Sequence, residues 1–112
     1  MKILFIISAS IAIKKCYGIL AQLTNQKILI DCIVTNNAKK MINSKDLKKN
    51  ISGKIYSDSS EKNNTMFHIK LTRKTDLIVV CPATANIIAK FANGFADDLA
   101  STSLIASNKQ II

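Results

Sequence analysis

Aromatic residues are scarce in this sequence: they make up 5% of the 112 residues, whereas apolar residues together make up 48%. The hydrophobic core must therefore be built from aliphatic side chains, chiefly those of isoleucine, leucine, valine and alanine. Internal repeats and low-complexity segments are absent as well, so nothing in the composition divides the chain. Its length and apolar content suit one globular domain, 1–112.

Acidic residues are also few. There are 7 of them against 16 lysines and arginines, which gives a net charge of +9. Much of the excess lies in residues 39–62, where arginine is absent and Tyr56 is the only aromatic residue. Proteins that bind single-stranded nucleic acid combine a basic groove with aromatic side chains on which bases stack. We therefore interpret this stretch as a solvated lysine-rich loop and expect no nucleic-acid partner.

Paired cysteine motifs are missing. Cys16, Cys32 and Cys81 are far apart, and no two of them have the spacing of a zinc site or a redox motif. Each has apolar neighbours, among which a free cysteine behaves as a small hydrophobic residue. We expect free thiols, no metal site and a reducing, cytoplasmic location.

The N-terminus imitates a signal peptide, because Lys2 precedes an apolar run at residues 3–13. However, Lys14 and Lys15 follow at once and no small-x-small cleavage site comes after the run. Eleven residues are also too few to span a bilayer. We predict a buried first strand that runs into a helix, and no membrane association.

The apolar pattern predicts alternating strands and helices. Continuous aliphatic runs predict buried strands at 2–8, 28–35 and 76–81, with the start of a fourth strand at 110–112. Helical spacing predicts helices at 10–23, 38–42 and 84–91 and a helical turn at 68–73. A last helix is predicted to end at 105, with Asp97 or Asp98 as its cap. Residues 43–65 are predicted to be an exposed, partly disordered polar excursion with a marginal strand at 55–56.

This alternation predicts an α/β fold with a Rossmann-like, doubly wound parallel sheet. Ligands of such sheets bind beyond the carboxyl ends of the strands. Here these ends are residues 8–10, 35–37 and 82–86, and all three contain small hydroxyl or amide side chains. Such donors beside helix N-termini predict a binding site for an anion.

Three segments carry a more specific signal: 68–71 (HIKL), 76–86 (DLIVVCPATAN) and 88–99 (IAKFANGFADDL). Together they resemble the phosphopantothenoylcysteine decarboxylases, which belong to the homo-oligomeric flavin-containing cysteine decarboxylases. The resemblance implies a flavoprotein domain that binds FMN, acts on phosphopantothenoylcysteine to give phosphopantetheine in coenzyme A biosynthesis, and assembles into trimer-based oligomers.

The resemblance also implies roles for individual residues. His68 matches the catalytic histidine, which can act as a base near the flavin; the alternative is a surface histidine. Ser10 and Thr35 match hydroxyls that hold the FMN phosphate, and ordinary helix caps are compatible with that role. The remaining cofactor-binding residues implied are those of the first phosphate loop and of the flavin-contacting turn: Ala9, Ile11, Thr84, Ala85, Asn86 and Ile87. Asp97 and Asp98 match a family pair and are interpreted as capping and structural residues; the alternative is a contact to substrate or to a neighbouring subunit.

The sequence departs from the family pattern in three places. Ala9 replaces a glycine, which would strain the first loop if the loop needs a positive φ there. Ile87 replaces a threonine, so one hydroxyl partner is lost. The sequence stops at Ile112, before the family's Pro-Ala-Met-Asn segment and the lid cysteine that follows it.

The domain is therefore expected to be C-terminally incomplete and inactive alone, completed by a separate chain or encoded by a decaying gene. Two alternatives remain open. One is another FMN enzyme, either a different cysteine decarboxylase or a flavin prenyltransferase, although residues 88–99 argue against the prenyltransferase. The other is a non-catalytic binding module.

Overall fold

The computed structural model describes residues 1–57 and 72–112. The strands are β1 (Lys2–Ile7), β2 (Leu29–Val34), β3 (Ile55–Tyr56), β4 (Leu77–Val80) and β5 (Gln110–Ile111). The helices are η1 (Ile11–Lys14, a 3-10 helix), α1 (Lys15–Asn25), α2 (Asn36–Lys39), α3 (Ser44–Lys49), α5 (Ala85–Ala92) and α6 (Leu99–Ala106). None of these helices is long and apolar enough to cross a membrane.

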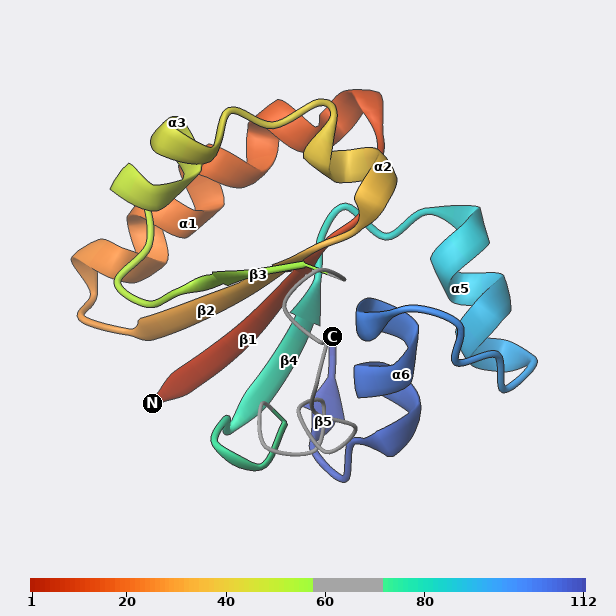
Figure 1. The fold of residues 1–112 in the computed structure, drawn as a ribbon. Coiled ribbons are helices and arrows are strands. Elements are labelled where there is room, and N and C mark those ends of the chain that lie inside the picture. Colours follow the sequence, from red (N-terminus) through yellow and green to blue (C-terminus); the bar gives the residue numbers. More distant parts are fainter. Residues whose placement is uncertain (58–71) are drawn as a thin grey trace.

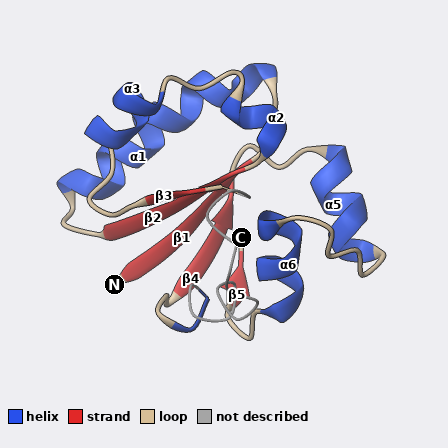
Figure 2. Ribbon diagram, in the orientation of Figure 1, coloured by secondary structure: helices blue, strands red, loops and turns tan. Residues whose placement is uncertain are grey.

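The strands form one parallel sheet in the order β3-β2-β1-β4-β5 (Figure 1). β1 is the central strand because every residue from Ile3 to Ile7 is aliphatic or aromatic and almost fully buried. Helices cover both faces of the sheet (Figure 2). The predicted doubly wound α/β fold is therefore confirmed, including the short strand at 55–56 and the strand at 110–112.

Alternate side chains of β1 point into two separate cores. On one face, Ile3, Phe5 and Ile7 pack with buried side chains of η1, α1, α2 and α3, such as Leu20 and Leu47. On the other face, residues of β1 such as Leu4 pack with α5 and α6. This alternation is the physical reason why an uninterrupted aliphatic run becomes a strand that is covered on both sides.

The structure defines the starts of three predicted helices. The helix predicted from Ser10 starts as η1, and α1 then continues to Asn25. The short helix predicted at 38–42 is α2, which begins at Asn36 because the side chain of Thr35 caps it. Asp98, one of the two caps that the sequence predicted, caps α6.

α3 lies inside the segment that was predicted to be an exposed excursion. Asn43 caps this helix, and Leu47 anchors it in the core with no exposed surface. Asp46 in its first turn and Lys48 and Lys49 in its last turn also complement the helix dipole. The part of the excursion at 58–65, and residues 68–71 of the predicted helical turn, lie outside the described residues.

The chain order of the strands creates a switch point. The path runs outward from β1 through β2 to β3 and then returns to place β4 on the other side of β1. Connections that leave β1 and β4 therefore diverge to opposite faces of the sheet and leave a crevice at their carboxyl ends. The site described next lies at this edge.

Candidate functional site

A pocket of about 390 Å³ lies beyond the carboxyl ends of β1, β2 and β4. Its volume is within the range of small-molecule and cofactor sites. The residues that line it are Ser8, Ala9, Thr35, Asn36, Asn37, Thr84, Asn86, Ile87, Lys90, Asp97 and Asp98. Hydroxyl and amide groups predominate at the strand ends, whereas the charged residues come from α5 and the turn before α6.

Hydrogen bonds that involve β1 and the residue after it fix the relative positions of the strand ends. The backbone N–H of Thr35 donates to the carbonyl of Ile7 (3.1 Å), and that of Cys81 donates to the carbonyl of Ile6 (3.0 Å). The buried hydroxyl of Ser8 donates to the carbonyl oxygen of Pro82. The loop after β1 and the turn after β4 are thus joined directly behind the pocket.

Thr35 and Thr84 hold equivalent positions at two helix starts. The Oγ1 of Thr35 accepts the N–H of Ala38 at the start of α2, and the Oγ1 of Thr84 accepts the N–H of Ile87 at the start of α5, each over 3.3 Å. A hydroxyl group that accepts in this way still has its own hydrogen to donate. Both threonines can therefore donate to an anionic oxygen in the pocket, beside helix ends that favour negative charge.

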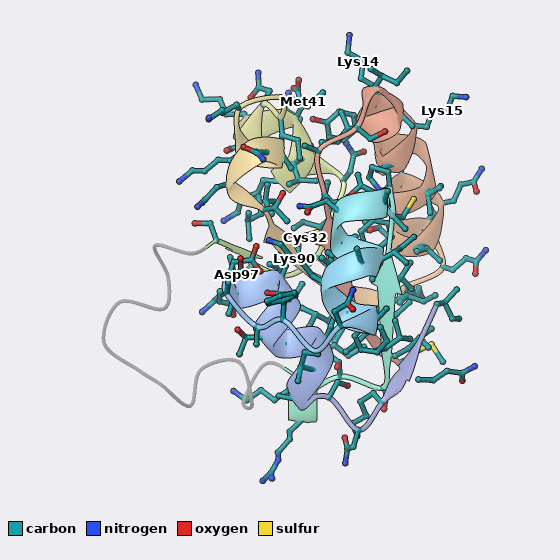
Figure 3. The ribbon with its side chains drawn as sticks, turned by 90° about the vertical axis from the view of Figure 1, so that its right-hand side faces the viewer. Lys14, Lys15, Cys32, Met41, Lys90 and Asp97 are labelled. Carbon is teal, nitrogen blue, oxygen red and sulfur yellow. The ribbon has the colours of Figure 1, made fainter. Side chains whose placement is uncertain are left out.

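The opposite wall of the pocket is an ion-pair cluster. The Nζ of Lys90 lies 3.1 Å from the Oδ1 of Asp97 and 3.5 Å from the Oδ2 of Asp98, and Figure 3 shows Lys90 and Asp97 close together where α5 approaches the turn before α6. The hydrogen bond with Asp97 raises the pKa of Lys90 and lowers the pKa of Asp97. Both groups are thus held in their charged forms.

A helix-ending turn places this cluster. Gly94 has a φ of +72°, and the N–H of Phe95 donates to the carbonyl of Lys90 (2.8 Å) while the N–H of Gly94 donates to that of Phe91 (3.3 Å). These two bonds define a Schellman motif. The turn directs the chain back along α5, so that Asp98 can both meet Lys90 and cap α6.

The structure brings together five of the eight predicted cofactor-binding residues. Ala9, Thr35, Thr84, Asn86 and Ile87 line the pocket, whereas Ser10, Ile11 and Ala85 are not among the lining residues.

The three exceptions have well-defined places in the local structure. The Oγ of Ser10 accepts the N–H of Ala12 (3.2 Å) as the cap of η1, and the side chain of Ile11 is 98% exposed. Ala85 is the first residue of α5, directly after the cap Thr84. The pocket is thus adjacent to the first loop through Ser8 and Ala9 rather than through Ser10.

Ala9 does not have the backbone strain that was considered for it. Among the described residues, Lys27 is the one non-glycine residue with a positive φ. Ala9 therefore has a conformation that an L-residue adopts readily, and the replacement of glycine only adds a methyl group at the pocket wall.

Sequence reasoning assigned no role to Lys90. A single lysine on a helix has no sequence pattern that distinguishes it from a solvent-exposed lysine. The two carboxylates that pair with Lys90 come later in the chain, after the turn at Gly94. The Asn93-Gly94 pair indicated the turn, but the partner of Lys90 depends on the direction in which the chain returns.

His68, the predicted catalytic residue, lies outside the described residues. The described parts of the chain also contain no group of three or more histidine, cysteine or acidic side chains that could hold a metal ion. The chemistry of the pocket can therefore be argued from its hydroxyl, amide and charged groups.

Comparisons with known proteins place this geometry in context. Residues 1–111 match the family described as Flavoprotein. The chain is 31% identical over 111 residues to the coenzyme A biosynthesis bifunctional protein CoaBC of Bacillus subtilis, covering 97% of this chain and 27% of that protein. It is 33% identical over 107 residues to the probable phosphopantothenoylcysteine decarboxylase of Streptococcus mutans, covering 94% of this chain and 60% of that one.

A solved structure supports the same fold. The FMN-dependent cysteine decarboxylase TvaF from thioviridamide biosynthesis superimposes with a TM-score of 0.90 at 20% identity, covering 99% of this chain and 70% of that one. The chain thus spans about a quarter of its bifunctional relative and less than two thirds of the single-function one.

Proposed function

Because the chain belongs to the Flavoprotein family, we propose that it binds FMN in the pocket at the β1/β4 switch point. We further propose that it forms the cofactor-binding part of a phosphopantothenoylcysteine decarboxylase of coenzyme A biosynthesis. The observation that carries this proposal is the convergence of Ala9, Thr35, Thr84 and Asn86 on one pocket. The bifunctional and single-function relatives support the choice of substrate.

The residues present suit a flavin phosphate at the end of the pocket formed by β1 and β2. The hydroxyl of Thr35 would donate to the phosphate there, and Asn36 and Asn37 add amide groups to the same part of the pocket. The carboxylates of Asp97 and Asp98 would repel a phosphate, but they line the pocket from the turn before α6 and are paired with Lys90. The phosphate is therefore assigned to the end with hydroxyl and amide groups.

The turn after β4 suits the ring system. Thr84 and Asn86 provide short polar side chains at the start of α5, and Ile87 provides an apolar surface. Bound FMN would supply a two-electron acceptor for oxidation of a cysteine side chain. Within this chain, the roles proposed are phosphate binding for Thr35, ring positioning for Thr84 and Asn86, and proton transfer for His68.

A titration that compares FMN with riboflavin tests the cofactor site. The fluorescence of FMN should be quenched when it binds to the protein. The variant Thr35→Val should weaken FMN binding about 10-fold or more, because a hydrogen bond to a charged group contributes about 1.5–3 kcal/mol. Riboflavin lacks the phosphate, so its weaker binding should hardly change.

The matched control is Asn43→Ala, which removes the cap of α3, a helix that contributes no residue to the pocket. This variant should lose stability while its FMN affinity is retained. Several hundred micromolar FMN would detect even weak binding, with a dissociation constant approaching roughly 1 mM. If the wild-type protein does not quench FMN fluorescence at this concentration, cofactor binding is refuted. Equal weakening of FMN and riboflavin by Thr35→Val would refute the phosphate assignment.

The reaction is tested with a chimera that joins residues 1–112 to the part of the Streptococcus mutans relative that lies beyond the matched region. The chimera should release carbon dioxide from phosphopantothenoylcysteine, whereas residues 1–112 alone should not. His68→Asn in the chimera should retain the flavin spectrum and lose product formation. Decarboxylation of a peptide with a C-terminal cysteine in preference to phosphopantothenoylcysteine would instead indicate the other class of cysteine decarboxylase.

A further inference from the structure

Two of the three cysteines are in contact, although they are 65 residues apart in the sequence. Cys16 is the second residue of α1, and Cys81 directly follows β4. Their Sγ atoms lie 3.6 Å apart, and the thiol of Cys16 also donates to the carbonyl oxygen of Cys81 (3.2 Å). No redox motif brings them together, so the contact is a product of the fold.

We propose that Cys16 and Cys81 are a modification site at which a peroxide-class oxidant forms an intramolecular disulfide. A disulfide has an S–S length of about 2.05 Å, so the sulfur atoms need to approach by roughly 1.5 Å. The approach that remains is small, because the two sulfur atoms are already in contact. This proposal concerns the thiols themselves and does not depend on flavin binding.

The two thiols differ in access and therefore in order of reaction. Cys81 is partly exposed, whereas Cys16 is 1% exposed. Burial, followed by the hydrogen bond with Cys81 and the charge of that thiol, raises the pKa of Cys16 to about 12. Cys16 thus stays protonated at neutral pH, and Cys81 is the thiol that an oxidant reaches first.

The chemistry balances with one equivalent of peroxide. The sulfur of Cys81 attacks one oxygen atom of hydrogen peroxide, so that an S–O bond forms and the O–O bond breaks. Cys81 becomes a sulfenic acid, and the other oxygen leaves with the thiol proton as water. The sulfur of Cys16 then attacks the sulfur of Cys81, the S–S bond forms, and the hydroxyl group leaves with the thiol proton as a second water. The two thiols lose two electrons and two protons in total.

The bond would connect α1 to the wall of the pocket. Pro82 follows Cys81 directly and accepts the hydroxyl of Ser8, and Thr84 and Asn86 follow within the next few residues. The crosslink would also close a long loop that includes β2, α2, α3 and β3. In the loop-entropy account, closure of such a loop stabilises the folded state and should raise the melting temperature by roughly 15–20 °C.

The test uses the full chain, reduced and then treated with hydrogen peroxide under native conditions. The number of thiols titrated after denaturation should fall from three to one, and peptide mapping should join Cys16 to Cys81. The chain should remain monomeric on a non-reducing gel, melt at a higher temperature, and return to its original state with dithiothreitol.

Variants separate this pair from the third thiol. Cys32→Ala leaves the pair intact and should still form the disulfide, whereas Cys16→Ala and Cys81→Ala should not. Circular dichroism of the reduced variants checks that each of them folds. The peroxide treatment must be strong enough to oxidise dithiothreitol completely. If all three thiols are still free after it, the proposal is overturned, and a crosslink to Cys32 or between chains would also overturn it.

Discussion

The helices α1 and α5 end in the same kind of turn but have different residues at its left-handed position, and this difference predicts a gain in stability. α1 ends with the N–H of Lys27 bound to the carbonyl of Thr24 (2.9 Å) and the N–H of Ile28 bound to that of Leu23 (3.3 Å). This is the same Schellman pattern that ends α5 at Gly94. At the left-handed position, α1 has Lys27 with a φ of 63°, where α5 has Gly94 with a φ of +72°.

Replacement of Lys27 by glycine should stabilise the protein. A left-handed residue with a Cβ costs about 1–2 kcal/mol, and glycine returns about 0.5–1 kcal/mol of this through its greater freedom in the unfolded chain. The expected net gain is about 0.5–1 kcal/mol, or roughly 3 °C in the melting temperature.

Two controls make the assay specific. Lys27→Ala removes the charge near the helix end but keeps the Cβ, so it should bring no gain. Gly94→Ala introduces a Cβ that meets no atom within 4 Å, so its expected loss of about 1 kcal/mol reports backbone conformation alone. Urea unfolding monitored by circular dichroism measures all three variants. A lower midpoint for Lys27→Gly, or a gain for Lys27→Ala equal to that for Lys27→Gly, would refute the reasoning.

Two other predictions concern packing and pH. Gly53→Ala should cost about 2–3 kcal/mol, because the added Cβ would collide with the Oδ1 of Asp31 and the carbonyl of Ile30. Gly18→Ala, with open space on α1, should gain about 0.5–1 kcal/mol in the same thermal melts; equal effects of the two changes would contradict this. The hydrogen bond with Lys90 lowers the pKa of Asp97 in the folded protein from its ordinary value of 3.8. Asp97 therefore stabilises the fold at a pH above 3.8, and this contribution is lost as the pH falls through the pKa of the folded protein. The difference in melting temperature between wild type and Asp97→Asn should therefore be constant near neutral pH and shrink below about pH 4; a difference that grows on acidification would show that the ion pair has no such role.

The central fold was predictable because its strands are defined by local composition. β1, β2 and β4 are apolar runs apart from Asp31, and their assignment as strands follows from that pattern; β1 and β2 are buried over almost their whole length, whereas Ile78 is the buried residue of β4. α3 was not predictable in the same way, since Leu47 is its single buried residue and one apolar side chain produces no helical period. Its cap Asn43 and its charge distribution were the available signals, but the lysine-rich composition of the segment obscured them.

The site was predictable where its residues follow strand ends and less so where they depend on long-range geometry. Thr35, Thr84 and Asn86 line one pocket because parallel strands end at the same edge of the sheet. Ser10 was also expected at this site; it caps η1 and is not among the residues that line the pocket. The contact between Cys16 and Cys81 could not be predicted, because it depends on how α1 packs over β4.

Two independent arguments lead to the same pocket, and this agreement strengthens the proposal. The strand order alone places a crevice between β1 and β4, whereas the resemblance concerns the residues of the turn after β4. The ion-pair cluster on the opposite wall of the pocket adds a constraint that neither argument contains. Lys90 pairs with Asp97 and Asp98 because Gly94 reverses the chain after α5. The shape of the pocket is therefore coupled to a helix-ending turn, and a change at Gly94 should affect ligand binding as well as stability.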